Sequence, residues 1–268
     1  MLSWLSEIDL GTTGPPVSIG VRKLGDRPWL LKDEFISEDL RLKQELSQNK
    51  STTVFLADVD TEQAGDIVLS LIRKRGIQPT NINSVHPLEK AGLSVQEDLC
   101  LMHRTAEGWI LKAASLCFPS RWQLSEKIGK DISQIHEPVE GYEEHLSKRV
   151  NGFFDRLGKE PVWRRNWFIH PDNRLYQPQR PPNGDPIIGF SEIGEKLFVR
   201  SERQTLQLLD IPRWILFTIR VQRTPLKSLL LKRKEEFQKW ILEAPDSHHD
   251  HKGLVVEQVS EIQKALVN

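Results

Sequence analysis

Two neighbouring β-prone runs carry charged side chains within otherwise apolar sequence. In residues 214–222, apolar and polar residues alternate, and Arg220 lies in the middle of the polar set. In residues 197–204, Glu202 and Arg203 are adjacent, so a strand would point them to opposite faces. If these faces meet water, the charges form surface ion pairs that contribute little to stability. If they line a cavity, they form a pocket for a small charged or oxygen-bearing ligand. The spacing alone leaves both interpretations open.

A third run, residues 162–169, combines tryptophans with arginines. Alternation places Trp163, Arg165 and Trp167 on one face of a strand and Arg164 on the other. An arginine beside indole rings can stack on them or bind an anion such as a carboxylate or a propionate. A surface arginine on a packed strand gives the same pattern, so this run also has two interpretations.

One histidine lies where the backbone could aim it rigidly. His136 stands in the sequence Ile-His-Glu-Pro-Val, where Pro138 restricts the backbone before it. Such a histidine suits an axial metal ligand, although a lone histidine is more often structural. The other histidines considered as a ligand or base are His86, His103, His145 and His170.

Composition excludes several classes of protein. The 37 basic and 37 acidic residues cancel, which leaves no basic field to attract nucleic acid or an anionic membrane. The two cysteines, Cys100 and Cys117, cannot form a disulfide framework or supply the four thiolates of an iron–sulfur cluster. Cys117 could be a thiolate ligand or a small buried apolar residue. Gly-rich loops that bind nucleotide phosphates are absent, so we do not expect the chain to bind NAD(P)H by itself.

No segment predicts export or a membrane span. Glu7 and Asp9 interrupt any apolar run near the N-terminus. No stretch approaches the roughly 18 apolar residues that a transmembrane helix needs. We therefore expect a soluble protein of the cytoplasm, which is a reducing compartment.

Five β-prone runs and one intervening helical segment predict the core. A helix at about residues 142–157 separates a hairpin pair from three later strands. The strands are expected at residues 98–104, 109–118, 162–170, 197–204 and 214–222. This order predicts an α+β fold, a PAS-like five-stranded antiparallel sheet with helices on one face.

Further segments flank this core on both sides. Residues 1–90 predict an N-terminal arm and a helical/β extension packed on the core, residues 91–225 the core itself, and residues 226–268 C-terminal helices. A polar linker with the histidines of residues 248–251 is expected between those helices, and its spacing does not favour a metal site. The expected flanking elements are helices at 34–48, 60–75, 226–242 and 254–266 and a β-prone run at 52–57.

Six sequence blocks occur in the order found in one protein family. They are VQEDLCLM (95–102), CFPSRW (117–122), EKIGKDISQIHEPVEGY (126–142), WRRNW (163–167), VRSERQTL (199–206) and LFTIR (216–220). Over about residues 20–240 the chain resembles the haem-dependent oxidative N-demethylase family. Six ordered blocks are a specific signal, whereas each block alone is weak.

The resemblance implies a PAS-like subunit that binds haem b and acts as a monooxygenase-type N-demethylase. The family's characterised enzyme oxidises dimethylamine with oxygen, and the electrons come from NADPH through other subunits that carry flavin and an iron–sulfur centre. The implied partners are therefore a small secondary amine, O2 and a separate reductase subunit. The competing interpretation is a non-catalytic haem PAS module that senses a gas or binds a small ligand.

The resemblance also implies roles for particular residues. His136 matches the family's histidine in the I-H-x-P-V string and is the expected proximal iron ligand, with His145 on the following helix as the alternative. The residues expected at the catalytic, distal side are Glu202, Arg203 and Arg220. The residues expected to bind the haem itself, two of them through its propionates, are Arg121, Arg165 and Trp167.

Overall fold

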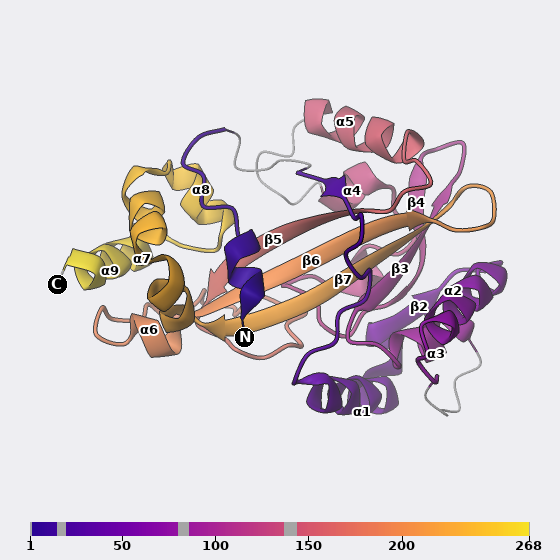
Figure 1. Ribbon diagram of the computed structural model, residues 1–268, viewed down its shortest axis with the longest axis horizontal. Helices are drawn as coiled ribbons and strands as arrows, with labels where there is room; N and C mark the ends of the chain where they lie inside the picture. Colours follow the sequence, from indigo (N-terminus) through magenta and orange to yellow (C-terminus); the bar gives the residue numbers. More distant parts are fainter. Residues whose placement is uncertain (1, 15–19, 80–85, 137–143, 268) are drawn as a thin grey trace.

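One antiparallel sheet organises the structure, which is a computed structural model (Figure 1). It describes residues 2–14, 20–79, 86–136 and 144–267, and for residues 136 and 144–149 it describes the backbone alone. The strands lie in the order β1-β5-β6-β7-β3-β4-β2, and each neighbouring pair is antiparallel. Their bounds are β1 (Arg22–Lys23), β2 (Phe55–Ala57), β3 (Asp98–Arg104), β4 (Trp109–Ser115), β5 (Val162–His170), β6 (Phe198–Leu208) and β7 (Trp214–Pro225).

The helices lie before, between and after the long strands. They are η1 (Ser3–Glu7), α1 (Ile36–Val54), α2 (Glu62–Lys74), α3 (Pro87–Gly92), η2 (Leu124–Glu126), α4 (Ile132–His136), α5 (Glu144–Asp155), α6 (Ile193–Lys196), α7 (Leu226–Glu243), α8 (Asp246–His251) and α9 (Val256–Val267). Within the described residues, no helix is both long and apolar enough to cross a membrane.

The five expected strands are confirmed as β3 to β7, but among the described residues the sheet has seven strands rather than five. β1, in the N-terminal arm, pairs with β5 at one edge of the sheet, and β2 pairs with β4 at the other edge. The β-prone run at 52–57 is strand only from Phe55, because helix α1 continues through Val54.

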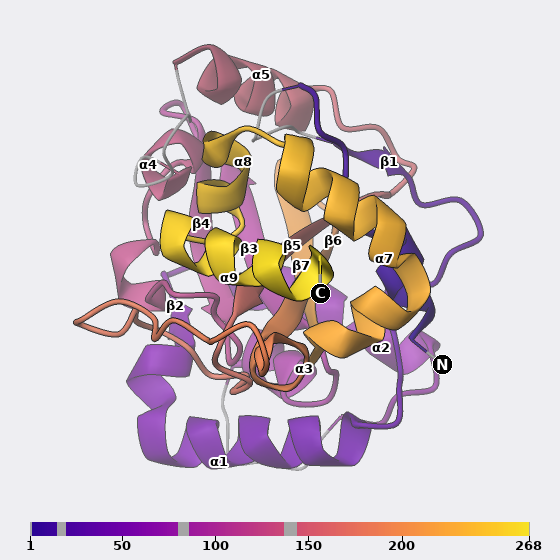
Figure 2. The same cartoon turned by 90° about the vertical axis from the view of Figure 1, so that its left-hand side faces the viewer.

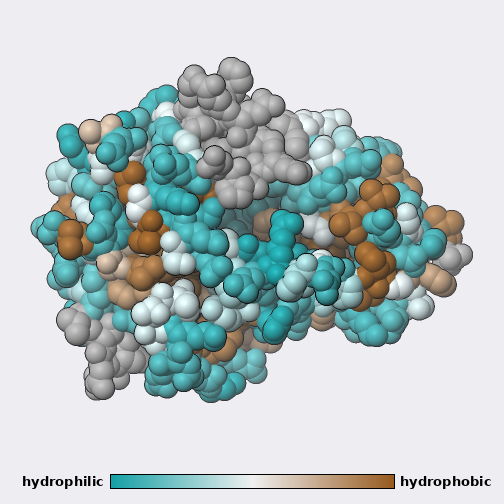
Figure 3. Space-filling model, turned by 180° about the vertical axis from the view of Figure 1, so that it is seen from behind, coloured by the Kyte–Doolittle hydropathy of each residue, from teal (hydrophilic) through white to brown (hydrophobic). Residues whose placement is uncertain are grey.

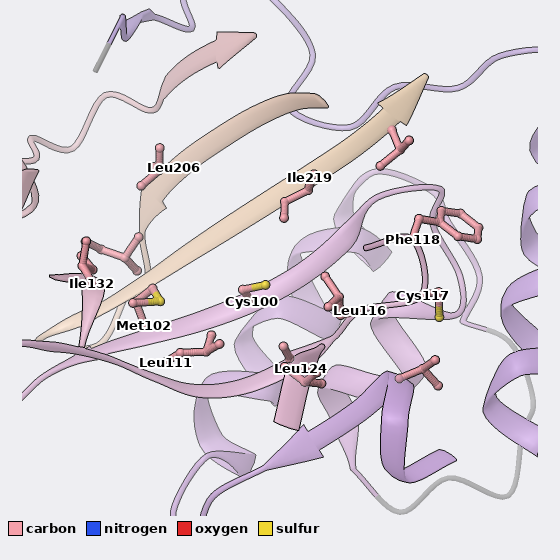
Figure 4. Close-up of a cluster of buried hydrophobic side chains, with 14 of the residues drawn as sticks. Cys100, Met102, Leu111, Leu116, Cys117, Phe118, Leu124, Ile132, Leu206 and Ile219 are labelled. Carbon is pink, nitrogen blue, oxygen red and sulfur yellow. The ribbon is translucent and has the colours of Figure 1, made fainter. Parts of the chain in front are cut away.

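Helices cover both faces of the sheet rather than one. On β3, Cys100 and Met102 belong to a cluster that includes Ile132 of α4 and Leu157, while Leu99 belongs to another cluster with α2 and α3. Figure 4 shows part of the first cluster. We call the two sides the α5 face and the α2 face. Alternation along each strand then decides which face a side chain meets.

A third cluster joins the two ends of the chain. Trp4, Leu5 and Ile8 pack with apolar residues of α7 and α9 and with Trp167 of β5. Figure 2 shows α7, α8 and α9 gathered at one end of the sheet. The expected polar linker is wrong, because residues 246–251 form α8. Two of its histidines are buried, and the His249 ring lies edge-on to Trp240 with centroids 4.9 Å apart.

Candidate functional site

A row of polar side chains crosses β5 and β6 on the α5 face. In the register of the two strands, Arg164 pairs with Gln204 and Asn166 pairs with Glu202. Glu202 is buried, and its Oε2 accepts a hydrogen bond from Gln204 Nε2 at 2.9 Å. Next to this row, β7 presents Val221, an apolar residue of the α5-face cluster. The face therefore combines a carboxylate and a guanidinium with an apolar wall, as the sequence pattern allowed.

The arginines Arg203 and Arg220 lie on the opposite, α2 face. They pair directly with each other across β6 and β7. Arg203 donates hydrogen bonds to the backbone oxygens of Pro28 and Trp29, at 2.6 and 3.2 Å. The structure thus does not bring these two arginines together with Glu202, because adjacent residues of a strand alternate between faces.

Arg220 belongs to a buried charge network that the sequence interpretation missed. Its guanidinium bonds Asp33 at 2.6 Å and Asp39 at 3.2 Å. Gln96 Nε2 donates to the same two carboxylates, at 2.9 and 2.7 Å. The sequence does contain an indication of this network, which is the polar run near the start of the block VQEDLCLM. Polar residues at the start of a buried strand need hydrogen-bond partners.

Two further charged residues, Lys43 and Asp98, are fully buried. Lys43 of α1 has an exposed fraction of 0% and bonds Asp98 at 3.1 Å, and it donates to Gly92 O at 3.1 Å. Asp98 also accepts the backbone N–H groups of Cys117 and Phe118, at 2.9 and 2.8 Å. This carboxylate fixes the chain after β4, where the block CFPSRW begins.

Arg121 and His170 lie near each other at one end of the sheet. Arg121 has a positive φ of 65° and binds both carboxylate oxygens of Asp185, at 2.6 and 2.5 Å. His170 is buried, and burial, followed by the charges of Arg121 and Arg200, lowers the pKa of His170 to about 3. Its imidazole is therefore neutral at physiological pH.

Arg165 and Trp167 hold the N-terminal segment. Arg165 donates to Glu7 Oε2 from two nitrogens, at 3.0 and 2.8 Å, and its guanidinium lies 5.6 Å from the Trp4 ring centroid. Trp167 donates its indole N–H to Asp9 O at 2.9 Å. The anion expected beside Arg165 is thus present as a carboxylate of the same chain.

The two histidines expected as iron ligands lie at helix ends around the α5 face. His136 is the last residue of α4 and His145 is near the start of α5, and the side chains of both lie outside the described residues. Cys117 is fully buried and burial raises the pKa of its thiol to about 12, so it is not a thiolate. Among the residues that the structure describes, no three His, Cys, Asp or Glu side chains form a metal cluster.

Three buried polar atoms near the α5 face have no hydrogen-bond partner among the described residues. They are Arg121 Nε, Arg164 Nε and His170 Nδ1. A buried guanidinium is stabilised by an anion. Arg121 already binds the Asp185 carboxylate, whereas Arg164 has no acceptor among the described residues, so an anionic group such as a haem propionate would satisfy Arg164. From behind, the surface is hollowed near its middle and hydrophilic side chains line the hollow (Figure 3).

Fold and site define an α+β protein whose antiparallel sheet carries buried polar and charged side chains on one face. The chain belongs to the haem-dependent oxidative N-demethylase, alpha subunit-like family, whose model matches residues 53–259. This match confirms the family indicated by the six sequence blocks. None of the curated proteins searched matches the chain.

Proposed function

We propose that this chain is the haem b-binding subunit of an oxidative N-demethylase that acts on a small secondary amine. The observation that carries the proposal is Glu202, a buried carboxylate on the α5 face. An ammonium substrate needs such a carboxylate, and the family description supplies the haem and the oxidative reaction.

The reaction balances with one oxygen molecule and two electrons. An N-methyl amine, O2, two protons and two electrons give the demethylated amine, formaldehyde and water. Haem, when bound, supplies oxygen activation next to the substrate. The chain's own part is to hold the ammonium at Glu202 and to exclude water from the apolar cluster on the same face.

The core of residues 91–225 is proposed to be PAS-like. Its strands lie in the order β5-β6-β7-β3-β4, so the hairpin β3–β4 is followed by α4 and α5 and then by three strands. This connectivity supports the layout expected from the sequence. The flanking segments 1–90 and 226–268 would be extensions of that core.

His136 is proposed as the iron ligand, with His145 as the alternative. Ile132, on the same short helix α4 as His136, packs in the α5-face cluster. Arg121, whose two terminal nitrogens bind Asp185, is proposed to meet a propionate through its Nε, which is buried without a partner among the described residues. Arg165, Trp167, Arg203 and Arg220 would act as positioning residues that hold β5, β6 and β7 through the N-terminal arm.

The electrons are proposed to come from a separate reductase subunit with flavin and an iron–sulfur centre. The family description names an alpha subunit, which implies an assembly. Both cysteines of this chain are free and buried, so they cannot hold a cluster. Free thiols also agree with the proposed cytoplasmic location.

A visible spectrum tests the proposal. The purified protein should show a Soret band, and His136→Ala should remove it while His145→Ala keeps it. A missing band in the wild-type protein would contradict haem binding.

Turnover of small secondary amines with a supplied reductant then tests catalysis. We expect formaldehyde as a product, and Glu202→Gln should raise KM about tenfold, because a charged hydrogen bond contributes about 1.5–3 kcal/mol. Glu107→Gln, in the exposed β3–β4 turn, is the matched control. Oxygen binding without product would contradict the enzyme and indicate a gas or ligand sensor.

A further inference from the structure

A small polar pocket lies at the edge of β5, where the N-terminal segment and α8 meet. Its volume is about 90 Å³, and its lining includes Thr13, Arg164, Asn166, His251 and Lys252. Three of these five side chains carry basic nitrogen groups. The volume suits a group of a few heavy atoms.

Arg164 has no hydrogen bond and no ion pair within the part of the chain that the structure describes. Its Nε is completely shielded from solvent without a partner, and burial lowers the pKa of its guanidinium. The neighbouring Arg165, by contrast, has hydrogen-bond partners, because it donates to Glu7, Ser201 and Gln222. The residue as a whole is half-buried. A shielded Nε without an acceptor is costly, so an anion in the pocket would stabilise Arg164.

Lys252 and His251 converge on Arg164 from the end of α8. Lys252 Nζ donates to Asn166 Oδ1 at 3.1 Å, and its backbone oxygen accepts from Ile169 N–H at 2.8 Å, which ties this segment to β5. Burial and then the charge of Arg164 lower the pKa of Lys252 to about 8. Burial and then the charges of Lys252 and Arg164 lower the pKa of His251 to about 4. All three groups would gain from an added negative charge.

Two acidic groups, Asp9 in the lining of the pocket and Glu202 nearby, act on this cluster from a distance: the charge of Glu202 raises the pKa of Arg164, and both charges raise the pKa of Lys252. Asp9 is exposed and its Oδ1 accepts from Gly11 N–H at 2.9 Å. Glu202 accepts from Gln204, and among the described residues no ion pair joins either carboxylate to Arg164 or Lys252. His248, at the other side of the pocket, has its Nε2 at 3.0 Å from Gly14 O.

We propose that Arg164, His251 and Lys252 form a binding site for an oxyanion, a carboxylate or phosphate group held by charge-assisted hydrogen bonds. The source is either a free small oxyanion or a propionate of the proposed haem. The site itself does not depend on the proposed function, because it rests on the pocket and on the unpaired Arg164.

The test is a thermal titration of the purified protein with sodium phosphate, with sodium chloride at matched ionic strength as reference. We expect Tm to rise with the logarithm of the phosphate concentration once this exceeds the Kd, by about 3 °C at ten times the Kd. Arg164→Gln should abolish the rise, and Arg73→Gln, an exposed arginine on α2, should keep it. A far-UV circular dichroism spectrum checks that R164Q is folded.

A second experiment, in which absorbance measures hemin binding, distinguishes a free oxyanion from a haem propionate. A free oxyanion predicts that the phosphate effect persists with haem bound and that R164Q binds hemin normally. A propionate predicts that haem removes the phosphate effect and that R164Q binds hemin at least tenfold more weakly. An equal phosphate effect in wild type and R164Q, or no effect in both together with normal hemin binding, would overturn the site.

A spectroscopic readout adds an independent check. Reductive methylation labels the lysine amines with 13C. The signal that is missing in Lys252→Gln belongs to Lys252, and its pH dependence gives the pKa of that residue. Phosphate should raise this pKa in the wild type and leave it unchanged in R164Q. A Lys252 pKa that does not respond to phosphate or to hemin would count against the site.

Discussion

At the residue scale, His170 should make the protein sensitive to acid. Its pKa of about 3 in the folded state lies below the ordinary value of 6.5, so the unfolded chain binds the proton first as pH falls. The stabilisation is complete above pH 6.5 and is lost between pH 6.5 and about 3, at up to about 1.4 kcal/mol per pH unit. Urea unfolding at several pH values gives the free energy of unfolding as a function of pH. Below pH 6.5 this free energy should fall less steeply with decreasing pH for His170→Gln than for wild type. Equal slopes would contradict a neutral buried His170.

The same scale shows how far site residues could be predicted. Alternation correctly separated Glu202 from Arg203, since it depends only on the period of a strand. It could not say which partners Arg203 and Arg220 meet, because those partners come from the arm, about 170 to 190 residues earlier in the chain. The pattern favoured Arg165 as the anion-binding arginine, whereas Arg164 is the one of the two that has no partner among the described residues. Pairing is a tertiary property that local sequence does not carry.

At the element scale, Gly92 lets α3 approach β4. A Cβ at Gly92 would lie 2.4 Å from Ser115 Cβ and 2.2 Å from its Oγ. Gly92→Ala should therefore destabilise the protein by about 1–3 kcal/mol through overpacking. Ser115→Gly removes the clash, so the double variant should recover most of that loss in a double-mutant cycle of denaturant midpoints. Additive losses would show that the contact is not the cause.

Strands were easier to predict than helix ends. β3 and β5 match the expected bounds, because apolar alternation and turn residues mark both ends of each. α1 instead runs on through Thr52 and Thr53, which are β-prone, before the chain turns into β2. α8 was missed because a run of histidines and aspartates lacks an apolar period, yet Trp240 and the N-terminal segment bury two of those histidines. In both places tertiary packing overrides local preference.

At the scale of the whole molecule, the N-terminal segment closes the structure at two sites. Trp4, Leu5 and Ile8 fill the cluster beneath α7 and α9, and Arg233, where α7 is kinked, donates to the backbone oxygens of Leu5 and Ile8, both at 2.8 Å. Further along the segment, Glu7 neutralises Arg165 on β5. We therefore expect the two ends of the chain to form one cooperative unit with the edge of the sheet.

Removal of residues 2–12 should loosen the C-terminal helices as well as lower global stability. Burying an apolar side chain of this size contributes about 1.5–3 kcal/mol, so losing Trp4, Leu5 and Ile8 should cost several kcal/mol and leave Arg165 buried without its carboxylate. Hydrogen exchange should then quicken in α7 and α9 more than in β3 and β4, which lie away from this cluster. Glu7→Gln, which keeps the apolar contacts and removes only the charge, should lower Tm without opening the helices. If hydrogen exchange in α7 and α9 were as slow in the truncated protein as in the wild type, the sheet alone would hold the C-terminal helices. The two ends of the chain would then not form one cooperative unit.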